Sequence, residues 1–248
     1  MACPAENLSC NVRDAKRVLS AAKRVVFLTG AGISAASGVP TFRGEGGYWR
    51  NRSVIALATP EAFDADPKIV WDWYLMRRQT IAARKPNAAH LAMANWAKAK
   101  RISRDIALFT QNVDGLHEAA GQPDVERLHG SLWVNRCTKC GKEREDRALE
   151  YAELPLSPCC KALERPGVVW FGERLPRCTM LKATVFVMAC EAMVVVGTSG
   201  IVSTAADLIV TAHQRGAVVI DVNPEPDMVI ADIHVDEPAE VALHLILT

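Results

Sequence analysis

Apolar residues recur along the chain with two different spacings. Near the amino end they lie three or four positions apart, which is the repeat of one helix face, at Val12, Ala15, Leu19 and Ala22. The run that follows, 25–28, is continuously apolar and leads into a glycine-rich turn, as the buried strands of parallel sheets do. The pattern therefore predicts a helix followed by a buried strand.

The same alternation returns further along the chain. Asn87 is a suitable cap for a helix over 88–99, and the apolar run 106–110 predicts a strand after it. A strand, a helix and a strand are predicted next, at 193–196, 203–215 and 217–222. Strands that alternate with helices favour a parallel sheet, so we expect an α/β fold.

Two stretches interrupt this alternation. The segment 42–85 is rich in aromatic residues, and the segment 134–168 is rich in cysteine, proline and charged residues. We expect these two stretches to form a smaller unit that is inserted into one large domain. The large domain would then consist of 1–41, 86–133 and 169–248.

Composition limits the classes of function. The 248 residues are 50% hydrophobic and 23% charged, which suits a globular chain with a full core. The 29 basic and 28 acidic side chains leave a formal net charge of +1, so no strong field favours nucleic acid as a partner. No apolar run is long enough to span a bilayer, and the eight cysteines suit reduced thiols, so we expect a cytoplasmic protein.

Three segments at predicted strand ends could hold a ligand, because ligands of open parallel sheets bind beyond the carboxyl ends of the strands. The first, 30–43, offers two early glycines, hydroxyls and an arginine, but it lacks the full Gly-x-Gly-x-x-Gly spacing and could be a tight turn. The second, 110–117, has an amide pair and a carboxylate that could orient a ribose or cap a helix. The third, 197–199, with 221–225 after it, could hold phosphate and adenosine or form ordinary turns.

Three further motifs lie between the second and the third of these segments. They are Leu128-His129-Gly130-Ser131, Cys137-x-x-Cys140, and Arg165-Pro166 followed by Val169-Trp170-Phe171-Gly172-Glu173. The whole set resembles the sirtuin family from about residue 25 to residue 239. The resemblance implies a Rossmann-like large domain, and a small domain made of a helical module at 42–85 and a zinc module at 134–168.

The resemblance also implies NAD as a co-substrate that the reaction consumes, with three groups of contacts. The pyrophosphate and the nicotinamide ribose would meet Gly30, Ala31, Gly32, Ser34, Phe42, Arg43 and Trp49. The ribose and nicotinamide pocket would contain Gln111, Asn112 and Asp114. The adenosine half would meet Gly197, Thr198, Ser199, Asn223, Pro224, Glu225 and Ala239.

His129 is the general base that the resemblance implies, with Asn112 as a second catalytic residue. An imidazole with an ordinary pKa of about 6.5 is largely neutral at working pH, yet it is basic enough to take a proton from a ribose hydroxyl. The expected products are free lysine, nicotinamide and 2'-O-acyl-ADP-ribose. His90 and His117 lack such a context, and we expect them to be helix-surface or core residues.

The resemblance assigns the residues 169–173 to the substrate, whose backbone would pair with them by strand addition. Tyr74 and Arg77 are three positions apart, so on a helix they share a face and could bind one carboxylate. The alternative is a solvated arginine beside a core tyrosine. Together with the small Ala58, the pair resembles class III sirtuins, which remove succinyl, malonyl or glutaryl groups, and we expect deacetylation as well.

The metal site departs from the pattern of the family. A structural Zn²⁺ usually takes two Cys-x-x-Cys pairs, and Cys137 and Cys140 form the first. Cys160 stands at the fourth position, but Ser157 occupies the third, and an extra Cys159 lies beside Cys160. We expect one structural Zn²⁺ per chain, held by these cysteines with Cys159 completing the set, although adjacent ligands require a strained backbone. A module without metal is the alternative.

Two other functions would use the same cleft. A protein mono-ADP-ribosyltransferase would deliver the ribose to a protein side chain, and a non-catalytic module would bind NAD or acyl-lysine without needing His129. We expect acylated-lysine proteins or peptides as partners of a monomeric chain, with no nucleic-acid or membrane partner.

Overall fold

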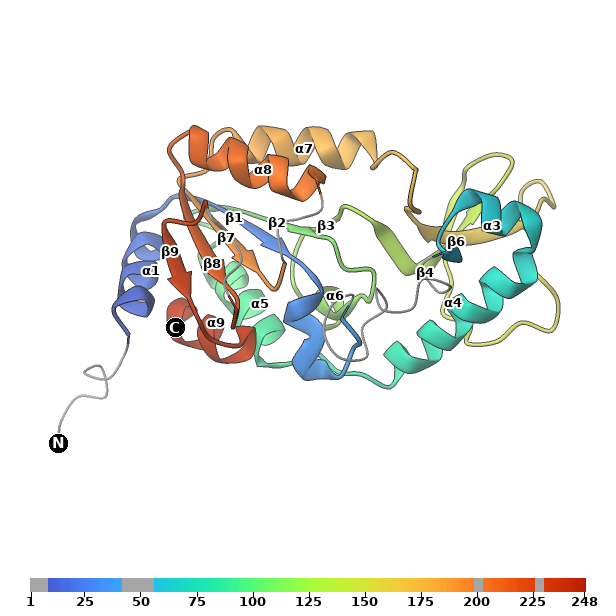
Figure 1. Cartoon of the computed structure of the whole chain (residues 1–248), viewed down its shortest axis with the longest axis horizontal. Helices are drawn as coiled ribbons and strands as arrows, with labels where there is room; N and C mark the ends of the chain where they lie inside the picture. Colours follow the sequence, from blue (N-terminus) through green and yellow to red (C-terminus); the bar gives the residue numbers. More distant parts are fainter. Residues whose placement is uncertain (1–8, 42–55, 199–202, 226–229) are drawn as a thin grey trace.

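A computed structural model describes residues 9–41, 56–198, 203–225 and 230–248 (Figure 1). Its centre is a six-stranded parallel sheet with the order β3-β2-β1-β7-β8-β9. The strands are β1 (Arg24–Thr29), β2 (Asp105–Thr110), β3 (Val125–Arg127), β7 (Ala192–Val196), β8 (Val218–Val222) and β9 (Ile233–Val235). The chain winds outward from β1 in both directions, which places a topological switch point between β1 and β7.

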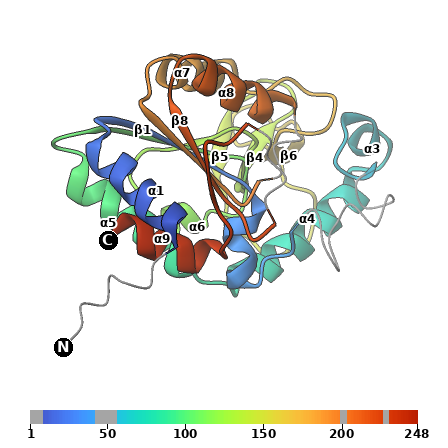
Figure 2. The same ribbon diagram turned by 60° about the vertical axis from the view of Figure 1, so that its left-hand side comes forward.

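Helices cover both faces of this sheet (Figure 2). One face is covered by α1 (Cys10–Ala21), α5 (Ala88–Lys100) and α9 (Ala239–Leu247), and the other by α7 (Arg177–Val187) and α8 (Ser203–Gln214). Val25 and Phe27 of β1 pack into the first core, whereas Val26 and Leu28 pack into the second. Because both faces of the strand are buried, its sequence is continuously apolar.

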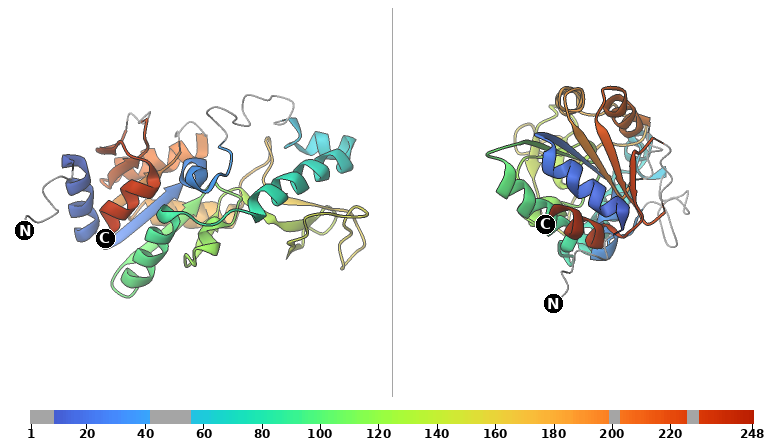
Figure 3. Two further views of the ribbon diagram at one scale, coloured as in Figure 1. Left: turned by 90° about the horizontal axis from the view of Figure 1, so that it is seen from below. Right: turned by 90° about the vertical axis from the view of Figure 1, so that its left-hand side faces the viewer.

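A smaller unit lies at the end of the molecule remote from α1 and α9 (Figure 3). It contains α3 (Pro60–Ala65), α4 (Pro67–Ala82) and a three-stranded antiparallel sheet with the order β5-β4-β6. These strands are β4 (Gly130–Cys137), β5 (Glu143–Glu145) and β6 (Glu164–Val168). A separate apolar cluster around Trp71 joins α4 to β4 and β6, and it includes Leu132 and Trp170, which the predicted boundaries place in the large domain.

The predicted fold class and the predicted helices and strands are confirmed. Asn87 caps α5, since its side chain accepts hydrogen bonds from the backbone N–H groups of Ala89 and His90. Two short elements follow strands at the carboxyl edge of the parallel sheet. The 3₁₀ helix η2 (Ala31–Ser37) comes after β1, and α6 (Leu116–Ala119) comes after β2. Among the described residues, no helix is long and apolar enough to cross a membrane.

Candidate active site and metal centre

The first and third predicted ligand segments touch at the carboxyl edge of the sheet. The backbone N–H of Gly32 donates to the carbonyl oxygen of Gly197 at 2.8 Å, directly after β1 and β7. A Cβ on Gly32 would lie 2.5 Å from the Cα of Gly197, and Gly197 itself has φ +60. Both glycines are therefore required by the close approach of two backbone segments.

The second segment meets the first through Ser34, Asn112 and Asp114. The Ser34 hydroxyl donates to Asp114 at 2.8 Å, and Asn112 Nδ2 donates to the Gly30 carbonyl at 2.9 Å and to Ser34 Oγ at 3.3 Å. Asp114 also accepts from the backbone N–H of Leu116, the first residue of α6, at 2.8 Å while it faces the other polar groups. Burial raises the pKa of the Asp114 carboxyl.

The remaining residues predicted to contact NAD lie mainly where the second and third segments meet. Gln111 Nε2 donates to Thr198 Oγ1 at 3.0 Å, and Asn223 Nδ2 donates to the Thr198 carbonyl at 3.3 Å. Pro224 and Glu225 continue from Asn223 as an exposed bend, and the buried Ala239 begins α9. Ala31 begins η2, whereas Phe42, Arg43, Trp49 and Ser199 lie outside the described residues.

His129 lies between β3 and β4, and one of its two ring nitrogens already makes a hydrogen bond. Its Nδ1 is 3.0 Å from the carbonyl oxygen of Gln111, and because a carbonyl can only accept, Nδ1 carries the hydrogen. Nε2 is then left with a lone pair and can act as a base. Burial lowers the pKa of His129 in spite of the Gln111 hydrogen bond, so the ring is neutral at physiological pH.

A group of buried polar side chains lies beneath this edge of the sheet, and the motifs did not predict it. His117 Nε2 is 2.9 Å from Thr29 Oγ1, His90 Nε2 is 3.5 Å from Ser34 Oγ, and the two imidazole centroids are 4.9 Å apart. Burial lowers the pKa of His90 to about 3 and that of His117 to about 4. Both are core residues, which was one of the two expectations for them. They also support the candidate site through their contacts with Thr29 and Ser34.

Tyr74 and Arg77 lie together on α4, and both are buried, with exposed fractions of 1% and 6%. The Arg77 guanidinium carbon is 5.4 Å from the centroid of the Tyr74 ring and 4.9 Å from that of Trp73. The Tyr74 hydroxyl accepts a hydrogen bond from Trp170 Nε1 at 2.8 Å. Arg77 is thus held among aromatic rings and is not a solvated side chain.

The predicted substrate segment 169–173 runs beside these residues. The Val169 N–H donates to the carbonyl oxygen of His129 at 2.9 Å, and the Phe171 N–H donates to that of Ala58 at 3.0 Å. The segment is therefore tied both to His129 and to the chain just before the helices of the small unit. Phe171 and Gly172 at its tip are exposed.

Four thiols converge in the small unit and form a candidate metal centre. The Sγ atoms of Cys137, Cys140, Cys159 and Cys160 all lie within 4.8 Å of one another. The turn that brings the adjacent pair inward is closed by a hydrogen bond from Lys161 N to Ser157 O at 2.9 Å, and Lys161 has φ +57, an uncommon value for a residue with a side chain.

Four such thiolates are a donor set that structural Zn²⁺ prefers. Cys159 completes the set, whereas the Ser157 hydroxyl lies 3.1 Å from Cys159 Sγ and is its hydrogen-bond partner. The residues present therefore fit one Zn²⁺ ion, in agreement with the predicted ligands.

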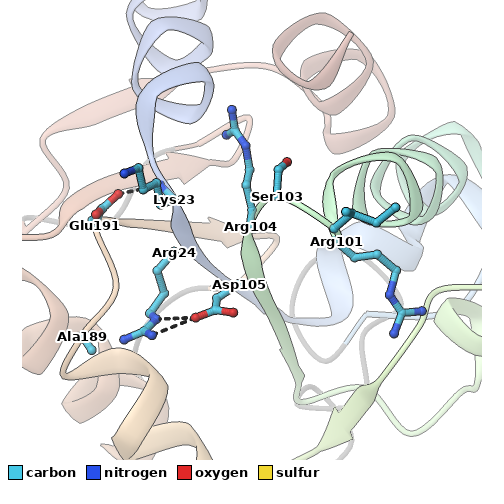
Figure 4. A pocket seen from close by; sticks show the side chains of 9 residues that line it. Lys23, Arg24, Arg101, Ser103, Arg104, Asp105, Ala189 and Glu191 are labelled. Carbon is cyan, nitrogen blue, oxygen red and sulfur yellow. Dashed lines mark hydrogen bonds and ion pairs between the residues drawn. The ribbon is translucent and has the colours of Figure 1, made fainter.

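A hollow of about 490 Å³ at the amino ends of the strands is drawn in Figure 4. Three of its charged side chains already have partners: Arg24 pairs with Asp105 at 2.8 Å, and Arg104 donates to the carbonyl oxygens of Ala22 and Ser20 at the end of α1. The predicted ligand segments lie at the opposite edge of the sheet, so we do not assign the reaction to this hollow.

Comparison with known proteins agrees with the geometry. The sequence pattern of the Sir2 family matches residues 30–204. An NAD-dependent protein deacylase of Aquifex aeolicus (strain VF5) is 47% identical over 223 residues, which cover 88% of this chain and 92% of that protein.

Two solved structures extend the comparison. A Sir2 homologue in complex with NAD superimposes with a TM-score of 0.86 and 42% identity, covering 94% of this chain and 92% of that one. A Sir2 variant with a deacetylated p53 peptide and 3'-O-acetyl-ADP-ribose gives a TM-score of 0.82 and 29% identity, covering 95% and 96%. The chain therefore belongs to the Sir2 family of NAD-dependent protein deacylases.

Proposed function

We propose that this deacylase removes succinyl, malonyl and glutaryl groups from lysine side chains, and acetyl groups as well. NAD is consumed, and the products are free lysine, nicotinamide and 2'-O-acyl-ADP-ribose. The observation that carries the acyl preference is the burial of Arg77 beside Tyr74 on α4. A guanidinium held in a water-poor, aromatic setting is stabilised most by an anion, and an acyl chain that ends in a carboxylate supplies one.

Arg77 lies close to residues that we propose to surround the acyl chain and the nicotinamide. Its positive charge lowers the pKa of the Tyr74 phenol, against the larger effect of burial, and it acts in the same direction on Asp114. Arg77 thus lies near enough to both residues for its charge to reach them. An acyl chain bound between Tyr74 and Arg77 would place its amide toward Asp114 and the proposed nicotinamide pocket.

The proposed chemistry assigns one proton transfer to His129. NAD supplies the sugar carbon from which nicotinamide departs, and the acyl oxygen of the substrate attacks that carbon. His129 Nε2 would then take a proton from a ribose hydroxyl, and the Gln111 carbonyl would stabilise the imidazolium through Nδ1–H. The deprotonated hydroxyl would attack the imidate carbon, and addition of one water would break the bond from that carbon to the lysine nitrogen, leaving the acyl group on the ribose oxygen. Asn112 is held by its hydrogen bonds to Gly30 and Ser34, so its amide oxygen is the end that can orient a substrate group.

We further propose acylated-lysine peptides as the partners of the segment 169–173. Main-chain hydrogen bonds with this segment would supply affinity with little demand on the flanking sequence. The hydrogen bond from Phe171 to Ala58 joins the segment to the chain just before α3, so the peptide and its acyl group would contact one connected surface.

The acyl preference is tested by Arg77→Met, which keeps an unbranched side chain but removes the guanidinium and its charge. We expect the ratio of kcat/KM on succinyl peptide to that on acetyl peptide to fall by about 10- to 100-fold, because a hydrogen bond to a charged group contributes about 1.5–3 kcal/mol. Arg17→Met is the matched control, since Arg17 is an exposed residue of α1. An unchanged ratio in Arg77→Met would remove Arg77 from specificity.

The reaction itself is tested by incubating the protein with NAD and a succinyl-lysine peptide. Nicotinamide released together with free lysine supports deacylation. Nicotinamide released with ADP-ribose attached to protein would support transfer to a side chain instead, and no release would support a binding module.

A further inference from the structure

An ion pair closes over an indole ring behind the proposed acyl pocket. Arg165 Nη1 and Nη2 donate to the two carboxylate oxygens of Glu173 at 2.6 and 2.9 Å. The same guanidinium lies 3.3 Å from the centroid of the Trp170 ring, and Glu173 also accepts from the backbone N–H of Trp170 at 2.8 Å. Bidentate pairing and ring stacking are the two contacts for which arginine is best suited, so Trp170 is held at both its backbone and its ring face.

The held indole makes one polar contact, with Tyr74. Trp170 Nε1 donates to the Tyr74 hydroxyl at 2.8 Å, and the two side chains are only 3% and 1% exposed. An indole N–H can only donate, so the phenol oxygen must accept at this contact and its own hydrogen must point elsewhere. Burial raises the pKa of Tyr74, which keeps that hydrogen in place at neutral pH.

We propose that Trp170 is a positioning residue for acyl specificity, which fixes the Tyr74 hydroxyl as a hydrogen-bond donor to an acyl carboxylate. The Arg165–Glu173 pair in turn fixes the indole. This inference rests on the proposed function, and its ligand class is an acyl chain that ends in a carboxylate. A carboxylate only accepts, so it benefits from a preset donor, whereas the methyl group of an acetyl chain gains nothing from one.

The donated hydrogen bond also strengthens the donor that it creates. Hydrogen bonds in a chain polarise one another in a low-dielectric interior, so an N–H directed at the phenol oxygen makes its O–H a better donor. Trp170 also packs on the Phe63 ring, with centroids 5.4 Å apart. A test must therefore remove the N–H while an aromatic ring remains.

Trp170→Phe meets this requirement, and it should be measured beside Tyr74→Phe and the double variant. We expect Trp170→Phe to lower the ratio of kcat/KM on succinyl peptide to that on acetyl peptide by about 2- to 10-fold, the usual effect of one hydrogen bond. Tyr74→Phe should lower the ratio at least as much. The double variant should equal Tyr74→Phe, because the indole acts only through the phenol.

Arg77→Met, measured in parallel, separates this inference from the proposed function. If Arg77→Met lowers the ratio and Trp170→Phe slows both substrates equally, Trp170 only packs and the inference is overturned while the proposed function stands. If Arg77→Met also leaves the ratio unchanged, the proposed acyl preference fails and the inference falls with it.

A second variant covers the case in which Trp170→Phe does not fold. Arg165→Lys keeps the charge but loses the bidentate and stacking geometry, so the ratio should fall by about 2-fold or more in a protein with unchanged zinc content and Tm. An unchanged ratio in that folded variant would overturn the inference.

Discussion

The polar groups at the carboxyl edge of the parallel sheet and those inside the small unit are held in different charge states. At the sheet edge, burial lowers the pKa of His90 and His117 and raises that of Asp114, so the histidines are uncharged. In the small unit, the fully buried Arg78 donates to the Leu132 carbonyl and to Asn135 Oδ1, each at 2.7 Å.

Further charges surround Arg78 in the small unit. Arg144 pairs with Glu164 at 2.6 Å and with Asp146 at 2.7 Å. Burial raises the pKa of Asp146, but hydrogen bonds from Ala148, Tyr151 and Arg144 lower it overall. Arg78 thereby holds α4 to β4 and to the chain after β5, and removing Arg144 would leave the buried Glu164 without its cationic partner.

The contrast shows how one chain separates a frame from a binding region. Permanent ion pairs fix the frame of the small unit, where they also set the position of the helix that carries Tyr74 and Arg77. The histidines at the sheet edge stay neutral. A bound dinucleotide and a bound acyl group would therefore carry the strongest charges in that region.

The largest expected effect concerns the small unit, and it follows the loss of a metal ligand. We expect the wild-type protein to hold about one equivalent of zinc and Cys159→Ser to hold less than about half. Structural zinc supplies on the order of 10 kcal/mol in small zinc modules, so proteolysis within 134–168 should become much faster. Zinc analysis and limited proteolysis measure the two effects.

The control for Cys159→Ser is Cys178→Ser, which changes an exposed cysteine of α7. Full zinc content and an unchanged Tm in Cys159→Ser would contradict the assignment of Cys159. The neighbouring hydroxyl of Ser157 would then be the candidate for the remaining ligand, and Ser157→Ala in the same background would identify it.

The neutral side of the comparison depends on a base at the sheet edge. We expect His129→Asn to lower kcat by about 10²- to 10⁴-fold, since asparagine cannot accept the proton. In the wild type, kcat/KM should rise with pH through a midpoint below about 6.5, because burial lowers the pKa of His129 and only the neutral ring is a base. His213→Asn, which changes a half-exposed residue of α8, should retain its activity.

Either of two results would contradict this role for His129. One is a variant that keeps more than about a tenth of its activity, and the other is an acid limb in the pH profile that the variant still shows. The second result would assign the titration to another group.

The smallest of the three effects concerns the buried neutral histidines themselves. The unfolded chain protonates His117 below about pH 6.5, but the folded chain does so only near its pKa of about 4. Stability should therefore decrease as the pH is lowered through this window, by about 1.4 kcal/mol per pH unit for this group. His117→Gln should reduce the slope of unfolding free energy against pH by that amount.

Urea unfolding between about pH 4.5 and 6 provides the measurement, with His244→Gln on the exposed side of α9 as the control. Equal slopes for the wild type and His117→Gln would show that His117 is not held neutral, and the contrast between the two regions would then fail at this residue.

The elements that could be predicted from the sequence share a strong local signal. The strand before Gly30 is continuously apolar, and Asn87 is a cap that acts on its own neighbours. The short β3 and β9 carry no such pattern, because three residues are too few to show a period.

The candidate site divides in the same way. Motifs place His129 and the glycine turns, but the contact between Trp170 and Tyr74 joins residues 96 positions apart, and that between Arg78 and Asn135 joins residues 57 apart. No local spacing encodes such pairs. Cys159 was expected to complete the metal site at the cost of a strained backbone. The chain turns at Lys161, which has a left-handed conformation.

The two ends of the parallel sheet have a consequence for how copies of the chain meet in solution. Each outer strand offers only three residues of unpaired backbone, and charged side chains accompany both, with Glu126 and Arg127 in β3 and Asp232 and Asp236 flanking β9. Short, charged edges are poor templates for another chain to extend the ladder. In the part of the chain that the structure describes, these two edges should therefore disfavour edge-to-edge aggregation at high concentration.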